Sequence, residues 1–340
     1  MTRTLGPFDV SAISLGCMSL SHAYGTPPDQ SVGGDVLRKA LDLGYTHFDT
    51  AALYGFGANE TLIAGALGSR RNDFVRASKG GMFRNAEGKR EIDGRPEVIR
   101  KNCEESLSRL QTDVIDLYYL HRWDRRVPIE ESVGALAELV TEGKVRTIGL
   151  CEVSAPTIRR AHAVHPLAAV QSEYSLWTRN PEVAVLDACK ELGITLVAFS
   201  PLARGFLTGT LRDMSAFPAK DIRHNMPRFQ VDHFPGNLQL LDGLAALAEE
   251  SGHTMGNLAL AWLLAQAPHI VPIPGTTRTD HLAENIGALH VQLDAATLER
   301  LNALINQRTV SGARYNEATQ KEIDTEEVES RGSGKVLEVK

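Results

Sequence analysis

The sequence is poor in cysteine, and its cysteines stand far apart. The 340 residues include four, none in a CxxC pair or another spacing typical of a metal site: Cys17, Cys103, Cys151 and Cys189. A chain of this length buries a large core without disulfide bonds. We therefore expect reduced thiols in a reducing compartment, a cytoplasmic protein and no metal site.

Long apolar runs and an excess of basic residues are also missing. No apolar run approaches the length that crosses a bilayer, and residues 1–15 lack the basic and then apolar build of a signal peptide. The net charge of −6 and the pI of about 6.0 argue against binding to nucleic acid or to a membrane surface. The expected partner is a small molecule, and the sequence leaves a homo-oligomer open.

What the chain does have is a repeated alternation of short apolar runs and amphipathic stretches. The short runs predict strands at Ile13–Gly16, His47–Thr50, Phe74–Ser78, Ile115–Leu120, Val145–Leu150, Ala169–Gln171, Thr195–Phe199 and Ile270–Ile273. The amphipathic stretches predict helices at Val32–Leu43, Glu60–Leu67, Pro96–Leu110, Ile129–Glu142, Ala155–His165, Pro181–Leu192 and Asn257–Ala267. Such an alternation predicts an α/β fold with parallel strands joined by right-handed crossovers. Eight units form either an open doubly wound sheet or a closed barrel, and the count of eight favours a (β/α)8 TIM barrel.

Three segments depart from this repeat. Residues 3–10, with Gly6-Pro7 between two short runs, predict an N-terminal β-hairpin that plugs the bottom of the barrel. Residues 200–236 form a long loop after the seventh strand, and loops of this length are usually functional. We expect one barrel domain over residues 1–311 and a polar tail over residues 312–340, with the last residues, 332–340, mobile.

Four titratable residues lie at or just after predicted strand ends. Asp49 ends the second strand, and Tyr54 follows it five residues later. Lys79 and His121 follow the third and fourth strands. Because the active site of such a barrel lies at the C-terminal ends of its strands, these four side chains are expected to converge.

Reduction of a carbonyl group is the chemistry that this set suits. Tyr54 would give a proton to the developing alkoxide, and Lys79, held in place by Asp49, would lower the tyrosine pKa from its free value of about 10. A neutral His121 would donate a hydrogen bond to the carbonyl oxygen. Taken singly, each residue also has a structural reading, as a helix cap, a solvated cation, a packed ring or a core histidine. The joint spacing favours catalysis.

Several short motifs resemble, in type and order, those of the aldo-keto reductase superfamily, over the chain from Leu5 to Leu289. They are Asp49-Thr50-Ala51, Tyr54-Gly55, Asn59-Glu60, Ser78-Lys79 and Leu120-His121. The resemblance implies a TIM barrel that binds NADP(H) without a Rossmann fold and reduces aldehydes or ketones by hydride transfer. It also implies a catalytic tetrad of Asp49, Tyr54, Lys79 and His121. The run Gly149–Ser154 is similar to that of a bacterial subgroup with glutamate at this place.

Two segments carry groups that suit the phosphates of such a cofactor. A hydroxyl, small residues and an arginine suit a diphosphate after the seventh strand, at Ser200, Pro201, Leu202 and Arg204. After the eighth strand, amides and hydroxyls at a helix start form an anion site, and Arg278 suits a 2′-phosphate, so NADPH is expected rather than NADH. The resemblance assigns the adenosine half to Gly275, Thr277, Arg278, His281, Glu284 and Asn285. It assigns the nicotinamide half to Gly16, Cys17, Met18, Asp49, Cys151, Gln171 and Phe199.

The substrate pocket is expected among aromatic and apolar residues of the loops at the top of the barrel. They are Tyr24, Met82, Phe83 and Trp123. Such a mouth suits aldehydes or ketones with a flat or apolar body, and it leaves the particular compound open. A second function also stays open, that of an NADP(H)-binding redox-sensing regulatory protein with slow turnover.

Overall fold

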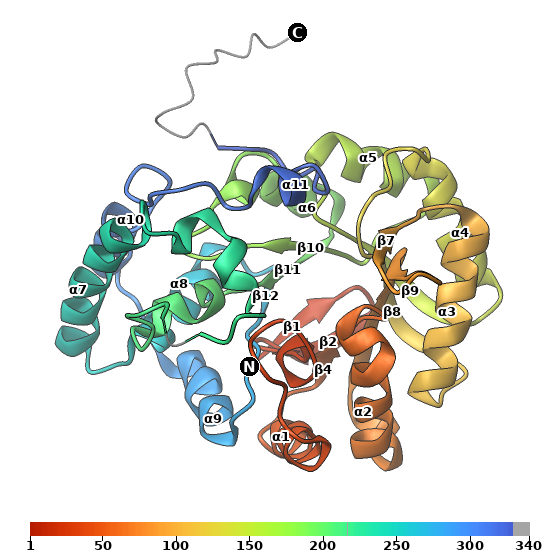
Figure 1. Cartoon of the computed structure of the whole chain (residues 1–340), viewed down its shortest axis with the longest axis horizontal. Coiled ribbons are helices and arrows are strands. Elements are labelled where there is room, and N and C mark those ends of the chain that lie inside the picture. The colour runs from red at the N-terminus through yellow and green to blue at the C-terminus, as the bar shows by residue number, and fades with distance from the viewer. Residues whose placement is uncertain (216, 329–340) are drawn as a thin grey trace, which may run out of the picture.

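A parallel β-barrel lies at the centre of the computed structural model, which describes residues 1–215 and 217–328 (Figure 1). Its strands, in the order β12-β11-β10-β9-β8-β5-β4-β3, are β12 (Ile270–Ile273), β11 (Thr195–Phe199), β10 (Ala169–Glu173), β9 (Val145–Cys151), β8 (Ile115–Leu120), β5 (Val75–Gly80), β4 (His47–Asp49) and β3 (Leu15–Gly16). Backbone hydrogen bonds from Ser14 N to the Pro272 carbonyl (2.9 Å) and from Gly16 N to the Pro274 carbonyl (3.2 Å) join the last strand to the first. The predicted TIM barrel is therefore confirmed, and the open sheet is excluded.

Helices surround the barrel (Figure 1). The predicted helices are α1 (Gln30–Asp42), α2 (Ala58–Leu67), α3 (Pro96–Leu110), α4 (Ile129–Thr141), α5 (Ala155–Val164), α6 (Val185–Leu192) and α8 (Met255–Gln266), and α9 (Thr279–Gly287) begins at the predicted helix start after the eighth strand. The sequence did not predict α7 (Phe234–Ser251), α10 (Ala295–Leu304) or α11 (Glu317–Gln320). Pro235, Gly236 and Gly243 weaken the helical signal of α7. Among the described residues, no helix combines the length and the hydropathy that a membrane span requires.

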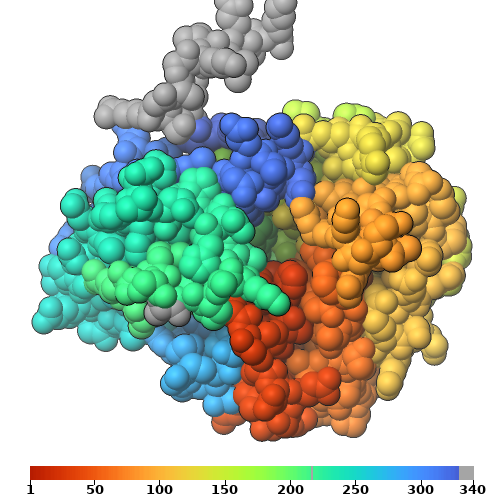
Figure 2. Space-filling model, in the orientation of Figure 1, coloured from red at the N-terminus to blue at the C-terminus, as the bar shows by residue number. Residues whose placement is uncertain are grey.

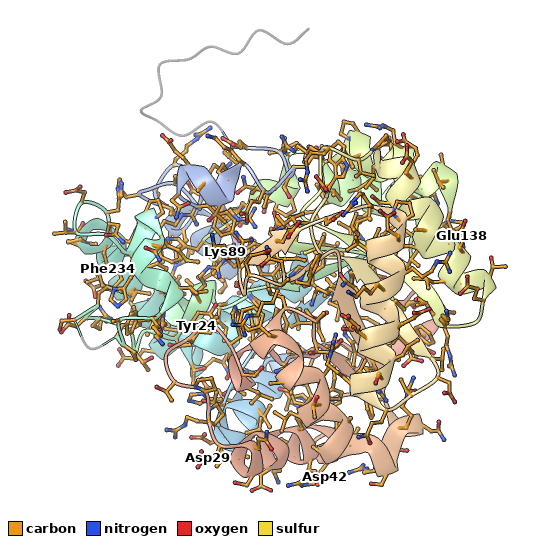
Figure 3. The ribbon with its side chains drawn as sticks, turned by 45° about the vertical axis from the view of Figure 1, so that its right-hand side comes forward. Tyr24, Asp29, Asp42, Lys89, Glu138 and Phe234 are labelled. Atoms are coloured by element: carbon orange, nitrogen blue, oxygen red, sulfur yellow. The ribbon has the colours of Figure 1, made fainter. Side chains whose placement is uncertain are left out.

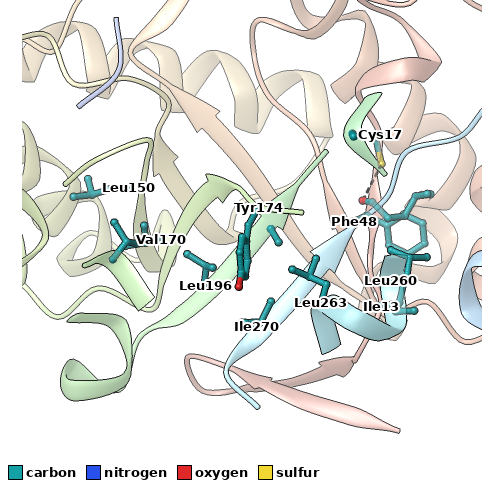
Figure 4. Close-up of a cluster of buried hydrophobic side chains, with 14 of the residues drawn as sticks. Ile13, Cys17, Phe48, Leu150, Val170, Tyr174, Leu196, Leu260, Leu263 and Ile270 are labelled. Carbon is teal, nitrogen blue, oxygen red and sulfur yellow. Dashed lines mark hydrogen bonds between the residues drawn. The ribbon is translucent and has the colours of Figure 1, made fainter. Parts of the chain in front are cut away.

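Alternate side chains of the barrel strands pack on opposite sides of the barrel wall. One set packs toward the helices, and its register partners on β9 to β12 lie in a row in Figure 4: Leu150, Val170, Leu196 and Ile270. A second buried cluster draws on the same strands: Ala77, Leu117, Tyr119, Ala169, Val197 and Val271. The barrel interior is thus a packed core, which leaves the strand ends as the place for a site.

The N-terminal hairpin closes the bottom of the barrel. Strands β1 (Thr2–Leu5) and β2 (Phe8–Ser11) pair antiparallel, and Leu5 and Val10 belong to the second buried cluster. The hydroxyl of Thr195, the first residue of β11, donates to the Thr4 carbonyl at 2.9 Å. The hairpin therefore lies at the N-terminal ends of the strands, as the sequence predicted.

Two segments that the sequence did not predict border the opposite, C-terminal end of the strands. An antiparallel hairpin of β6 (Met82–Arg84) and β7 (Arg90–Ile92) follows β5. Residues 312–328 return to the barrel, and Arg314, Tyr315 and Thr325 are buried there. Figure 2 shows a hollow at the centre of this face, between the red N-terminal, orange hairpin and blue C-terminal segments. The domain boundary at residue 311 stays a prediction, and the predicted mobile end, residues 332–340, lies outside the described residues.

The predicted long loop after the seventh strand contains three short 3-10 turns. These are η5 (Ala203–Thr208), η6 (Ile222–Asn225) and η7 (Pro227–Phe229). The loop ends where α7 begins at Phe234. Residues of this loop line the same hollow, beside the C-terminal ends of the barrel strands.

Candidate active site

The four predicted catalytic residues come together at the ends of three neighbouring strands. Asp49 ends β4 and Lys79 is the penultimate residue of β5, so the barrel register sets the two side chains next to each other. The Lys79 ammonium donates to an Asp49 carboxylate oxygen, to the Thr50 carbonyl at 2.9 Å and to the Tyr54 hydroxyl oxygen at 3.3 Å. All four tetrad residues are buried. The result is one connected cluster.

The charges around the Tyr54 hydroxyl act in opposite directions. Burial raises the pKa of Tyr54, and although Lys79 opposes that effect, the pKa stands at about 12. The sequence predicted a pKa lowered by Lys79, which underestimated the cost of placing a phenolate in a water-poor site. Burial alone would lower the pKa of Lys79, but the charge and hydrogen bond of Asp49 outweigh it and raise that pKa. Tyr54 is therefore protonated and Lys79 charged at neutral pH.

His121 lies across from Tyr54 as a neutral ring. Their ring centroids are 5.9 Å apart in an edge-to-face arrangement. Burial lowers the pKa of His121 well below its usual value, and the neighbouring Arg122 and Lys79 charges add to the effect. Its Nδ1 atom has no hydrogen-bond partner among the described residues. A neutral imidazole can donate one hydrogen bond to a bound oxygen.

A cavity of about 720 Å³ opens from this cluster across the top of the barrel. Of the predicted cofactor and substrate residues, those that line it are Gly16, Met18, Tyr24, Asp49, Met82, Cys151, Gln171, Phe199, Ser200, Pro201, Leu202, Arg204, Gly275, Thr277, His281, Glu284 and Asn285, together with Tyr54 and His121. Figure 3 shows Tyr24 near the middle of the molecule, whereas Asp29 and Asp42 lie at its outer edge. The residues predicted from the sequence thus form much of the cavity wall, although they come from segments that are far apart along the chain.

Three other predicted residues lie beside the cavity rather than on it. Lys79 is fully buried behind Tyr54. The backbone of Cys17 is already engaged, since its N–H donates to the Asp49 carbonyl at 2.9 Å and its carbonyl accepts from Asn59 at 2.8 Å. Arg278 is exposed at the start of α9 and pairs with Asp280 at 2.5 Å. The lining residues Thr277 and His281 flank Arg278.

Two predicted pocket residues need correction. Trp123 does not line the cavity, because its indole N–H donates to the Val127 carbonyl at 2.9 Å and its ring lies under the guanidinium of Arg160 on α5. Phe83 also lies off the cavity wall, since the residues of a strand alternate in direction and its neighbour Met82 is the one that faces inward. The aromatic residues that do line the cavity include Tyr24, Tyr54, Phe199 and Tyr315.

The segment after β11 turns through left-handed backbone. Positive φ angles follow one another at Ala203 (50°), Arg204 (59°) and Gly205 (91°), and Ser200 also has a positive φ of 49°. The N–H groups of Ala203 and Gly205 donate to the Ser200 and Leu202 carbonyls at 2.8 and 3.0 Å, so these two groups are used within the loop. The Arg204 guanidinium donates to Glu173 at 2.7 Å and to the Tyr315 hydroxyl at 3.0 Å. Its charge is thus shared with a carboxylate of β10.

The residues predicted to hold the nicotinamide include a polar, a sulfur-containing and an aromatic side chain. Gln171 donates to Asp49 at 2.8 Å, which links it to the tetrad. Cys151 ends β9, and its sulfur accepts a hydrogen bond from Arg122 at 3.2 Å. Burial raises the pKa of the Cys151 thiol, so it is protonated. Phe199, half-buried, ends β11 and presents a ring to the cavity.

Sequence reasoning missed several residues of the wall. They are Ser19, His22, Arg90, Arg122, Arg223, Tyr315, Asn316, Thr319 and Glu322, among others. Arg122 could have been predicted as a wall residue, because it follows His121 directly in the sequence. The residues of the C-terminal segment gave no local signal. Among the described residues, His, Cys, Asp and Glu side chains form no group of three or more that could hold a metal ion.

Comparison with known proteins agrees with this geometry. The sequence model of the Aldo/keto reductase family matches residues 12–306. The chain is 45% identical over 320 residues to "Aldo-keto reductase yakc [NADP(+)]" of Schizosaccharomyces pombe, covering 92% of this chain and 94% of that protein. It is 44% identical to "Probable aldo-keto reductase 1" of Glycine max, covering 91% of this chain and 89% of that protein.

Solved structures show the same fold. A glycerol dehydrogenase of Gluconobacter oxydans superposes with a TM-score of 0.82 at 30% identity, covering 89% of this chain and 94% of that one. An aldo-keto reductase of Bacillus halodurans superposes with a TM-score of 0.74 at 28% identity, covering 93% and 98%. Sequence, fold and tetrad agree, and the chain belongs to the aldo/keto reductase family.

Proposed function

We propose that this protein reduces aldehydes or ketones to alcohols, with NADPH as the hydride donor and Tyr54 as the proton donor. The observation that carries the proposal is the contact between the Tyr54 hydroxyl and the Lys79 ammonium at 3.3 Å, at the wall of a large cavity. Such a tyrosine serves as an acid only if a neighbouring cation stabilises the tyrosinate that it leaves behind. Lys79, held by Asp49, supplies that cation.

Each tetrad residue has a distinct part in this proposal. Tyr54 holds the proton on its hydroxyl at neutral pH, since its pKa is about 12. Asp49 keeps Lys79 charged and oriented, and Lys79 lowers the cost of proton release. His121, neutral because burial lowers its pKa, orients the carbonyl oxygen of the substrate by a hydrogen bond. His121 would thus orient the carbonyl group, and Tyr54, whose ring lies 5.9 Å from that of His121, would deliver the proton.

The residues of the cavity fit a nicotinamide dinucleotide phosphate. The Ser19 hydroxyl is buried on the cavity wall and has no partner among the described residues, so it is free to bond a ligand. The start of α9 presents backbone N–H groups that suit a phosphate, and Ser200 and Arg204 on the cavity wall suit a diphosphate. NADP(H) would supply the hydride. The name of the yeast relative, which is 45% identical, includes NADP(+).

We extend the proposal to the residues that hold this cofactor. The diphosphate would be held by Ser200, Pro201, Leu202 and Arg204. The adenosine half would be held by Gly275, Thr277, Arg278, His281, Glu284 and Asn285. The nicotinamide half would be held by Gly16, Cys17, Met18, Asp49, Cys151, Gln171 and Phe199. A cytoplasmic location also belongs to the proposal as a sequence-based prediction, and the sequence leaves a homo-oligomer open.

The test is to follow NADPH absorbance, and NADH absorbance separately, with a panel of small aldehydes and ketones. Rapid, substrate-dependent oxidation of NADPH is the expected result. Tight binding of NADPH with very slow turnover on every carbonyl compound would contradict the reductase and favour the redox-sensing protein. A protein that binds neither cofactor would contradict both functions.

A further inference from the structure

Arg122 is a cation on the wall of the cavity, directly after His121. It is half-buried, and one of its guanidinium nitrogens donates to the His121 carbonyl at 2.7 Å and to the Cys151 sulfur at 3.2 Å. Both acceptors are neutral, since burial keeps the Cys151 thiol protonated by raising its pKa. These contacts fix the direction of the side chain without neutralising its charge.

The other arginines on the cavity wall all have carboxylate partners. Arg90 pairs with Glu322, Arg204 with Glu173 and Arg223 with Asp221. Within residues 1–215 and 217–328, Arg122 forms no ion pair of 4.0 Å or less. Glu152, the residue after β9, is already paired with Arg314 and bonded by the Thr325 hydroxyl at 2.8 Å. Among the described residues, Arg122 is therefore the wall arginine without a direct carboxylate contact, and it feels the charge of Glu152, which raises its pKa, only at longer range.

A guanidinium that has no direct carboxylate contact in a partly water-excluded site attracts an anion. Its planar fork matches a carboxylate, which can accept two parallel hydrogen bonds from it. The attraction is stronger here than on the surface because the surrounding dielectric is lower. Arg122 follows His121 directly, so an anion bound to Arg122 would lie in the same cavity as Tyr54.

The anionic groups of the proposed cofactor would lie away from Arg122. Its phosphates belong to the loop at Ser200–Arg204 and to the start of α9, which follow β11 and β12. Arg122 follows β8, on the side of the barrel that carries His121 and the β6–β7 hairpin. The anion that pairs with Arg122 is consequently part of the substrate.

We propose that Arg122 binds a carboxylate of the substrate, and that the preferred substrates are aldehydes or ketones that carry a carboxylate group. This inference rests on the proposed reductase function. It names a class of substrate, carboxylated carbonyl compounds, and a specificity-determining residue. The ion pair would hold one end of the substrate while His121 orients the carbonyl at the other.

The experiment compares matched substrates that differ only in charge. The value of kcat/KM is measured with NADPH for the 2-, 3- and 4-carboxybenzaldehydes and for their methyl esters, in the wild type and in Arg122→Met. The control variant is Arg90→Met, which removes a wall guanidinium that Glu322 already pairs. The ratio of acid to ester is the readout, so any loss of activity common to both substrates cancels.

The wild type is expected to prefer at least one acid over its ester by about tenfold or more, since an ion pair of this kind is strong when desolvated. Arg122→Met should bring that ratio close to one, and Arg90→Met should largely retain it. A wild type without preference for any acid, or an equal fall of the ratio in both variants, would overturn the inference.

Binding measurements separate this inference from its alternatives. The dissociation constant of NADPH is measured by fluorescence for the same variants, and so is that of terephthalate for the NADPH-loaded protein. Terephthalate should bind the wild type and lose affinity in Arg122→Met, while NADPH affinity stays nearly constant. A loss of NADPH affinity with an unchanged terephthalate affinity would assign Arg122 to the cofactor instead. If no aldehyde is reduced, the reductase proposal fails, and terephthalate binding still decides whether Arg122 holds a carboxylate.

Discussion

Arg314 of the C-terminal segment forms a buried ion pair with Glu152, the residue after β9, although the two residues are 162 positions apart. The same guanidinium donates to Glu173, at the end of β10, at 3.0 Å. The next residue, Tyr315, lines the cavity. Ion pairs thus hold the segment of residues 312–328 to the barrel, and the Tyr315 part of the cavity wall depends on them.

Replacing Arg314 should destabilise the protein and damage the pocket together. Arg314→Met leaves Glu152 and Glu173 buried with fewer partners, which costs about 3–5 kcal/mol for an ion pair of this kind. Denaturant unfolding measures this loss. Arg300→Met, which breaks the exposed pair with Glu250, is the control and should change little. Equal stability of the two variants would contradict the structural role of Arg314.

Glu173 should make the fold sensitive to acid. Burial raises its pKa, but Arg204 and Arg314 outweigh that effect and hold the pKa near 2, below the usual value of 4.5. A carboxylate with a depressed pKa stabilises the folded state above pH 4.5, and this contribution is lost as the pH falls toward 2. Its size is on the order of 3 kcal/mol. The wild type should therefore be more stable than Glu173→Gln at pH 7, and the two stabilities should converge near pH 2. A difference that is independent of pH would contradict the assignment.

Arg278 should decide between the two nicotinamide cofactors. Its exposed side chain pairs with Asp280 beside the cavity, where it can turn to a 2′-phosphate. Arg278→Ala should raise the dissociation constant of NADPH by about tenfold and leave that of NADH nearly unchanged. Asp280→Asn removes the competing carboxylate and should not weaken NADPH binding. Equal losses for both cofactors in Arg278→Ala would refute the 2′-phosphate role.

The parts of the fold that depend on local pattern could be predicted from the sequence. Because strands and helices alternate along the chain, the sequence predicted the barrel and the ends of its strands. The strand ends in turn predicted where Asp49, Lys79 and His121 lie. Tyr54 was found by its short distance from Asp49 in the sequence. These residues converge because the register of neighbouring parallel strands leaves no other arrangement.

What failed depends on contacts between distant segments. Nothing near Arg314 in the sequence indicates that Glu152 and Glu173 lie beside it. Trp123 was placed in the pocket because it is close to His121, but a hydrogen bond to Val127 turns its ring outward. The pKa of Tyr54 was misjudged for a related reason, since the degree of burial is a property of the whole packed site.

The measurement that tests the central claim most directly is single-turnover oxidation of bound NADPH by an aldehyde, in Tyr54→Phe and in Tyr45→Phe. Tyr45 is also buried, but its hydroxyl donates to the Leu282 carbonyl at 2.8 Å, away from the tetrad. Loss of a general acid costs about 10²- to 10⁴-fold in rate, so Tyr54→Phe should be slowed by this amount while NADPH affinity is retained. Tyr45→Phe should turn over at a rate close to that of the wild type. Turnover in Tyr54→Phe as fast as in Tyr45→Phe would contradict the assignment of Tyr54 as the proton donor.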